Sequence, residues 1–322
     1  MLELADPVHA RLLDLLDGSH TERGLIRAAR HAGITSDDAA ALLRTLTAAG
    51  YVVDARTLEL TRGSEPTRRR LAAETTALAL RSDPAATMHR RLQSRVLVTG
   101  WSRLAVPIAC ILAASGVGHV DPDQNGIARL SDATPGGLLP TDAHRPRGVA
   151  AAEALRRVAP DLDVTPVRRT RATFAVLVGF SAPAGLTALS YARRRLAHLA
   201  VSVRDGTVVV GPLVRPGTSP CLNCLDLYRA ERDPDWHAVA AQLHTGPDIP
   251  EPVAATTALS GAAYAAFEVL THIDGGQPAT VGATVEISEP GKTTRRQWTQ
   301  HPGCGCRRRA RSRPGEPPSR HS

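Results

Sequence analysis

The chain has 322 residues, of which 43% are hydrophobic and 3% aromatic, and it carries a formal net charge of +8. A chain of this length exceeds one average domain, so we expect two folded units with a substantial core. No stretch approaches the roughly 20 apolar residues that a membrane-spanning helix needs, and the N-terminal sequence lacks the basic and apolar regions of a signal peptide, so we expect a cytoplasmic protein with no membrane partner.

Residues 1–62 show three helical patterns followed by two short strands. Apolar residues recur at helical spacing in three segments, residues 6–18, 20–33 and 35–50. The segments "YVVD" (51–54) and "TLEL" (57–60) alternate in polarity around a short polar turn, which is typical of a small hairpin. Three helices followed by a hairpin is the order of a winged-helix domain.

Residues 63–94 predict a helical connector, and a βαβ unit follows it. A buried strand runs to a turn at Gly100, a helix of small apolar residues comes next, and a second strand ends in the acids Asp121 and Asp123. Two parallel strands joined by a helix form one βαβ unit. We therefore expect an α/β domain over residues 95–306.

Further helices and strands alternate through this α/β domain. The pattern predicts helix 151–159, strand 173–180, helix 185–197, a hairpin over 198–214 that turns at Asp205 and Gly206, helix 251–275, and strands within 278–289 and 293–301. Residues 307–322 contain six arginines and one glutamate, so they contribute +5 of the net charge. We expect this basic tail to be disordered.

Four of the five cysteines form two tight pairs, Cys221 with Cys224 and Cys304 with Cys306. In a cytoplasmic chain, cysteines favour metal binding or buried thiols over disulfides. A C-x-x-C turn suits two corners of a zinc tetrahedron, and a Cys-Gly-Cys segment can supply the other two. The spacing predicts a closed, structural zinc site, with His301 as a competing ligand and two unrelated buried pairs as the alternative. Cys110 lies in an apolar helical pattern, which indicates a core position.

Several of these segments together resemble one superfamily. The βαβ unit with "ILAASGVGHVDPD", the segment "VVVGPLVRPGTSPCLNC", the long Ala-rich helix and the terminal cysteine pair resemble the E1-like, or ThiF, superfamily of adenylating proteins. "GPLVRPGTSPCLNCLDLYRAERDPDW" and "HPGCGC" look most like the ThiF-like, leader-peptide-binding partner proteins of azoline-forming cyclodehydratases, which act on ribosomally made peptides. The resemblance covers residues 64–306, and the winged helix is similar to the peptide-recognition element of those proteins. It implies a Rossmann-like E1/ThiF-type α/β domain with structural zinc behind a small winged-helix domain.

The sequence departs from this superfamily at the phosphate-binding turn. A working E1-like site has a Gly-rich turn after the first strand, where backbone N–H groups at a helix N-terminus approach the nucleotide phosphates. Here the turn reads "GWSRLA", in which only Gly100 remains. Trp101 and Arg103 would fill the space for a triphosphate, although Arg103 could also pair with one.

The other nucleotide contacts of the superfamily are incomplete as well. Its lysine has no counterpart, because the only lysine in the chain is Lys292, near the end. Asp121 and Asp123 persist where the superfamily binds ribose, but acids at strand ends are also common turn formers. Gly100, Arg103, Asp121 and Asp123 are therefore expected to form a degenerate nucleotide site.

A winged-helix domain more often binds DNA than a peptide, so both ligands are weighed for residues 1–62. A DNA-reading helix needs cations, since phosphate contacts supply most of the affinity. The third helix has Asp37 and Asp38 against Arg44 alone, a net charge of −1. The free edge of the hairpin is instead expected to take an extended peptide as an added strand. A purely structural role is the alternative; in the peptide-binding hypothesis the contact residues are Tyr51, Val52 and Val53.

The sequence therefore predicts a non-adenylating scaffold. It would bind the leader of a precursor peptide and present the core to a separate ATP-using enzyme of the cyclodehydratase type. We expect zinc as a cofactor and no ATP. The resemblance also implies that the chain could form a homodimer. Three alternatives stay open: an active ThiF-type adenylyltransferase, a DNA-binding regulator, and a relic without a peptide client.

Overall fold

The computed structural model describes residues 10–55, 64–80, 83–167, 171–179, 190–236, 238 and 251–306. The chain divides into two compact units, Met1–His89 and Arg90–Ser322. The division falls inside helix α6 (Pro84–Gln93). The basic tail, residues 307–322, and residues 185–189 of the predicted helix 185–197 lie outside the described residues; residues 190–193 of that helix are helical.

The first unit begins with three helices, α1 (Ala10–Asp14), α2 (Glu22–His31) and α3 (Ser36–Ala48). The hydroxyls of Thr21 and Thr35 accept hydrogen bonds from backbone N–H groups in the first turns of α2 and α3, as N-cap residues do. The helices pack around a small apolar core that includes Leu12, Leu25 and Ala29. All three predicted helices are present. α2 and α3 lie close to their predicted positions, whereas α1 covers only Ala10–Asp14 of the predicted 6–18, of which residues 6–9 lie outside the described residues.

The segment after α3 differs from the predicted hairpin. Residues 51–54 form no strand, because the backbone N–H groups of Tyr51 and Val52 both donate to the carbonyl oxygen of Leu46 and so close the C-terminus of α3. The second half of the hairpin, residues 57–60, lies outside the described residues. The winged-helix assignment is therefore not confirmed.

The first unit also contains helix α5 (Glu65–Ala79), which starts at the N-cap residue Ser64. Leu71 of α5 and Met88 of α6 are fully buried and form a second small core together with Leu78. This helical segment corresponds to the connector that the sequence predicts over residues 63–94.

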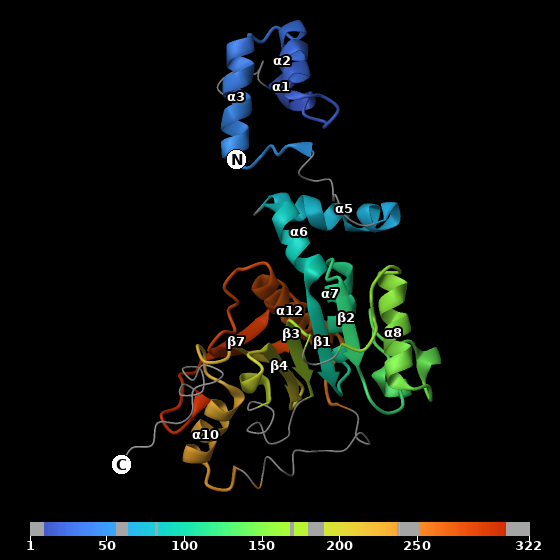
Figure 1. The fold of residues 1–322 in the computed structure, drawn as a ribbon, viewed down its shortest axis with the longest axis vertical. Coiled ribbons are helices and arrows are strands. Elements are labelled where there is room, and N and C mark those ends of the chain that lie inside the picture. The colour runs from blue at the N-terminus through green and yellow to red at the C-terminus, as the bar shows by residue number, and fades with distance from the viewer. Residues whose placement is uncertain are drawn as a thin grey trace. The chain divides into compact units, whose positions relative to one another are not determined.

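The second unit is built on one seven-stranded sheet in the order β2-β1-β3-β4-β5-β6-β7 (Figure 1). β1 pairs in parallel with β2 and β3, and β3 pairs in parallel with β4, whereas the remaining pairings are antiparallel. The predicted βαβ unit is confirmed by the parallel pairing of β1 with β2. The strands are β1 (Arg95–Gly100), β2 (His119–Asp123), β3 (Phe174–Val178), β4 (Ala197–Arg204), β5 (Thr207–Val214), β6 (Ala283–Glu289) and β7 (Lys292–Gln297).

Different helices cover the two faces of the sheet, because side chains alternate along each strand. Val96 and Val98 of β1 point into the larger core, which contains α7 (Ala105–Ala114), α8 (Arg147–Val158) and α12 (Ala255–Ile273). Leu97, between them, points into a smaller core with α10 (Leu222–Arg232). Two short 3-10 helices, η2 (Leu130–Asp132) and η3 (Pro140–Asp142), precede α8.

The predicted hairpin between β4 and β5 is confirmed. Asp205 and Gly206 have φ angles of 49° and 78°, the left-handed values that a two-residue turn between twisted strands requires. Among the described residues, no helix is both long and apolar enough to cross a membrane.

Candidate zinc and nucleotide sites

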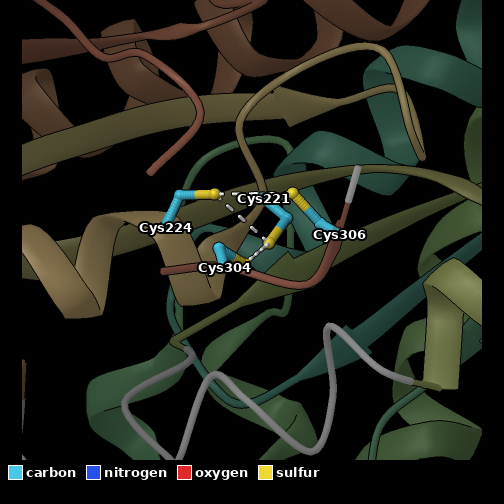
Figure 2. Close-up of side chains that lie close together, drawn as sticks. All are labelled: Cys221, Cys224, Cys304 and Cys306. Atoms are coloured by element: carbon cyan, nitrogen blue, oxygen red, sulfur yellow. Dashed lines mark hydrogen bonds between the residues drawn. The ribbon is translucent and has the colours of Figure 1, made fainter. Parts of the chain in front are cut away.

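The fold brings the two cysteine pairs together beside the smaller core (Figure 2). Cys221 is the N-cap residue of α10 and Cys224 lies in its first turn, while the other pair comes from the segment after β7. The Sγ atoms of Cys221 and Cys224 are 3.7 Å apart, those of Cys221 and Cys304 are 3.6 Å apart, and those of Cys224 and Cys306 are 3.6 Å apart. All four sulfur atoms lie within 4.8 Å of one another.

These distances fit a tetrahedral zinc ion. Four sulfurs held roughly 2.3 Å from a central zinc lie about 3.8 Å apart. The three measured distances are close to that value, and the donor set is all sulfur, which suits zinc. Four protein ligands leave no position for water or substrate, so an ion held here would be structural. It would cross-link the start of α10 to the segment after β7.

The competing ligand, His301, is turned to other partners. Its Nε2 lies 2.7 Å from a carboxylate oxygen of Glu231, and its Nδ1 accepts a hydrogen bond from the backbone N–H of Gly303 at 3.0 Å. Both ring nitrogens are therefore engaged. Asn223 donates instead to the Cys304 sulfur from 3.3 Å, which would orient that ligand.

Hydrogen bonds within the cluster give the thiols different pKa values. The pKa of Cys224 is lowered, chiefly because the Cys221 thiol donates a hydrogen bond to its sulfur. The same contact, together with burial, raises the pKa of Cys221. A divalent ion would displace the remaining thiol protons and add its binding energy to folding. Cys110 is separate: it lies in the larger core, where burial raises its pKa to about 11.

The turn between β1 and α7, where the superfamily binds phosphate, is held tightly against the end of β3. A Cβ atom on Gly100, whose φ is 105°, would lie 2.0 Å from the carbonyl oxygen of Val178. A Cβ atom on Gly179 would lie 1.8 Å from the carbonyl oxygen of Trp101. Both glycines are therefore required by the close approach of two chain segments, whatever the turn binds.

An internal carboxylate occupies the N-terminal end of α7. Oε2 of Glu251 accepts hydrogen bonds from the Ser102 hydroxyl at 2.6 Å and from the Arg103 backbone N–H at 3.0 Å. Glu251 is half-buried, and burial raises its pKa even though these two donors favour its charged form. Sequence analysis missed this residue, because it lies about 150 positions along the chain from its partners.

The side chains of the turn are also engaged inside the chain. The Arg103 guanidinium donates to the carbonyl oxygens of Val253 and Ala133, both at 3.2 Å. The guanidinium of Arg147 lies 5.4 Å from the centre of the Trp101 ring, in a cation–π contact. Arg103 and Glu251 together therefore fasten residues 251–253 to the turn.

The two acids at the end of β2 have different surroundings. Asp121 is buried and accepts a hydrogen bond from the Val167 backbone N–H at 2.7 Å, and burial raises its pKa. Asp123 is half-buried and accepts a hydrogen bond from the Thr99 hydroxyl at 3.0 Å. Asp121 thus has a structural partner, while Asp123 lies at the carboxyl ends of β1 and β2, where open α/β sheets bind their ligands.

The predicted peptide-binding residues lie directly after α3. Tyr51 is 63% exposed, Val53 is exposed and Val52 is half-buried. Their side chains are accessible, and their role in binding stays a prediction.

Comparison with known proteins places the fold. No protein-family model and no curated protein matches the chain. Among solved structures, Escherichia coli MccB bound to MccA-N7isoASN is similar, with a TM-score of 0.65 and 15% identity over 95% of this chain and 92% of MccB. MccB with ATP has a TM-score of 0.63 and 15% identity, covering 92% and 90% of the two chains. PaaA has a TM-score of 0.58 and 17% identity, covering 74% and 84%.

At these identities the likeness concerns the fold alone. The chain has the mixed, Rossmann-like α/β fold of MccB, a microcin C7 biosynthetic enzyme whose structures include complexes with the peptide MccA. This agrees with the E1-like fold that the sequence resembles. The branch of cyclodehydratase partner proteins is not distinguished by these matches.

Proposed function

We propose that this chain is a non-adenylating, E1-like scaffold that binds the leader of a precursor peptide and presents the peptide core to a separate ATP-using enzyme of the cyclodehydratase type. The observation that carries the proposal is the Glu251 carboxylate at the N-terminal end of α7. In an E1-like adenylating site this is the place of the nucleotide phosphates.

At this end of α7, a nucleotide triphosphate would compete with the Glu251 carboxylate. A helix N-terminus attracts negative charge through its unpaired N–H groups and its dipole. Here a carboxylate of the chain itself lies at this end of α7 and accepts hydrogen bonds from Ser102 and Arg103, the two residues before the N-cap Leu104. Its tether makes its local concentration far higher than that of a free nucleotide. A triphosphate would have to displace Glu251 and Arg103 from their partners and fit beside the Trp101 ring. The adenylation reaction therefore lacks its phosphate cradle.

Peptide binding is supported by the fold and by the charge of the first unit. MccB, which shares the fold, has been crystallised with the peptide MccA. Asp37 and Asp38 lie in the first turn of α3, where their negative charges interact favourably with the helix dipole and repel DNA phosphates. Exposed Tyr51 and Val53 offer apolar side chains to a peptide next to this helix. A zinc ion held by the four cysteines would stabilise the α/β domain and take no part in chemistry.

The active adenylyltransferase is the second candidate, because the structures of MccB include a complex with ATP. The two candidates differ in an isolated-protein assay. We expect the purified full chain to show no pyrophosphate exchange with ATP and no calorimetric binding of ATP under conditions in which E. coli MccB binds it. ATP-dependent activation of any peptide carboxylate by the isolated chain would replace the scaffold with the enzyme.

A capture experiment tests the peptide client. The full chain, used as bait in the lysate of its source cells, should retain a ribosomally made precursor peptide that mass spectrometry identifies. A synthetic leader should then displace the precursor, and a synthetic core should not. Displacement by the core alone would show that the chain recognises the substrate region and not the leader.

A further inference from the structure

A groove of about 340 Å³ lies between the C-terminal end of α10 and the end of β7. We call it the basic groove. It shares no residue with the β1–α7 turn or with residues 51–53, so an inference about it goes beyond the proposed function. It is lined by Tyr228, Arg232, Arg296, Gln297, Trp298 and Thr299.

The walls of the basic groove are held in place by contacts within the chain. The Tyr228 hydroxyl lies 2.7 Å from the Thr299 hydroxyl, and the indole N–H of Trp298 donates to the Thr284 hydroxyl at 3.1 Å. His301 packs edge-on against the Tyr228 ring, with ring centres 4.6 Å apart. Because these aromatic side chains are already fixed, a ligand that packs against them loses little conformational entropy.

β7 forms one edge of the sheet, and its outer edge is open among the described residues. It pairs only with β6, and all six of its residues are exposed. The opposite edge is different, because β2 is covered there: the backbone N–H of Val120 donates to Asp163, and that of Val167 donates to Asp121. An open edge presents unpaired N–H and C=O groups that an extended peptide can bind.

Positive charge gathers along this edge. β7 carries Lys292, Arg295 and Arg296 and no acidic residue. Arg296 pairs with Glu286 at 3.1 Å, whereas the Arg295 guanidinium donates to the uncharged carbonyl of Ala279. Arg232, on the opposite wall of the groove, has no ion pair with any other described residue. Its charge and those of Lys292 and Arg295 are therefore available to an external anion.

We propose that β7 and the basic groove bind an extended acidic peptide strand. The peptide adds to the outer edge of β7 through main-chain hydrogen bonds, and alternate side chains, about 6.7 Å apart, point to the face that carries α10. A carboxylate on this face then meets Arg232, while the intervening part of the strand packs along Trp298. The partner is thus a polypeptide segment in which acidic and β-forming residues alternate.

Nucleic acid fits this surface less well. Its binding depends on several phosphate contacts made by a run of cations, and it gains nothing from an open strand edge. On this edge, Glu286 and the exposed Glu289 of β6 lie beside the cations of β7. A single-stranded DNA of matched charge is therefore the comparison ligand in the test.

The test uses the full chain and labelled peptides of about ten residues, long enough to pair along a strand of β7's length. In the first, acidic peptide, glutamate alternates with valine or threonine. The second peptide has lysine in place of each glutamate. The third has the sequence of the first, but every second backbone nitrogen is methylated. By fluorescence anisotropy, we expect the acidic peptide to bind at least about tenfold more tightly than the lysine peptide. Methylation should weaken binding by about tenfold as well, because it removes main-chain donors.

Charge reversal on the protein provides the second arm. Arg232→Glu should weaken the acidic peptide by about tenfold or more. Arg156→Glu, an equal charge change at an exposed position of α8, should leave the affinity within about twofold, and circular dichroism should show both variants folded. Equal binding of the acidic and lysine peptides, or full affinity in the Arg232 variant, would overturn the proposal. If the single-stranded DNA bound more tightly than the acidic peptide, and Arg232→Glu abolished that binding, the groove would be assigned to nucleic acid instead.

Discussion

Replacing Glu251 by alanine should loosen the β1–α7 turn without unfolding the chain. The change removes the acceptor for two donors, the Ser102 hydroxyl and the Arg103 backbone N–H. A buried donor left without a partner costs roughly 1–3 kcal/mol, but this site is half-buried, so water can satisfy part of the loss, and the cost of burying the carboxylate disappears. We therefore expect a net loss of about 1–2 kcal/mol, which lowers Tm by about 2–8 °C in a domain of this size.

A glutamine at the same position separates the charge from the hydrogen bonds. Its side-chain oxygen can accept both bonds, but it cannot ionise. Burial raises the pKa of Glu251, so the folded chain holds this proton more tightly than the unfolded chain does. The resulting stability is present below the ordinary glutamate pKa and is lost as the pH rises through the folded-state pKa. The difference in free energy of unfolding between Glu251→Gln and wild type should therefore favour the variant more at about pH 7 than at about pH 4.

Thermal denaturation at both pH values measures these differences. Circular dichroism reports the fold as a whole. Tryptophan fluorescence is expected to change as well, because one of the three tryptophans, Trp101, lies in the turn. Glu289→Ala, which removes an exposed glutamate at the end of β6, is the control and should change Tm little. If Glu251→Ala melts at the wild-type temperature, the carboxylate does not hold the turn, and the argument against phosphate binding loses its main support.

Three further predictions concern other sites. Cys221→Ser or Cys304→Ser should lower the zinc content, measured by elemental analysis, from about one ion per chain to none, and should also lower Tm in thermal denaturation. Full zinc content in either variant would contradict the four-sulfur site. Tyr51→Ala removes an exposed aromatic side chain and should weaken leader binding about tenfold at unchanged zinc content; unchanged affinity in a titration excludes Tyr51 from the peptide-binding surface. Gly100→Ala places a Cβ 2.0 Å from the Val178 carbonyl and should destabilise the α/β domain by about 3 kcal/mol or more in urea; a wild-type midpoint contradicts the close approach.

Local patterns in the sequence predict most of the α/β fold. The strand, Gly-turn, helix and strand of the βαβ unit need only neighbouring residues, and so does the Asp205-Gly206 turn with its left-handed angles. The cysteine pairs were predictable for the same reason, since each pair is set by its own tight turn, and a zinc ion bound by all four thiolates would require the two pairs to meet. Residues 51–54 illustrate the limit: four alternating residues specify a strand only if a partner strand pairs with them.

Long-range partners explain what the sequence could not predict. "GWSRLA" shows that phosphate-cradling glycines are missing, but nothing near it indicates which group would satisfy the end of α7. Glu251 has no signature of its own, since an acid before a helix is common and its partners are about 150 residues away. The basic groove is similar, because Tyr228 and Trp298 come from elements that meet only in the folded sheet.

The filled turn and the cysteine site should act as separate contributions to stability. Val253 and α7, next to Glu251, belong to the larger core, whereas Cys221 and Cys304 belong to the smaller core on the other face of the sheet. Effects of substitutions without shared partners add to within about 0.5 kcal/mol. The double variant Glu251→Ala with Cys304→Ser should therefore lose the sum of the two single losses in urea denaturation, and Glu251→Ala alone should keep its zinc. A coupling free energy larger than about 1 kcal/mol would mean that the sheet transmits strain between its faces, and a bound metal would then help to hold the β1–α7 turn in place.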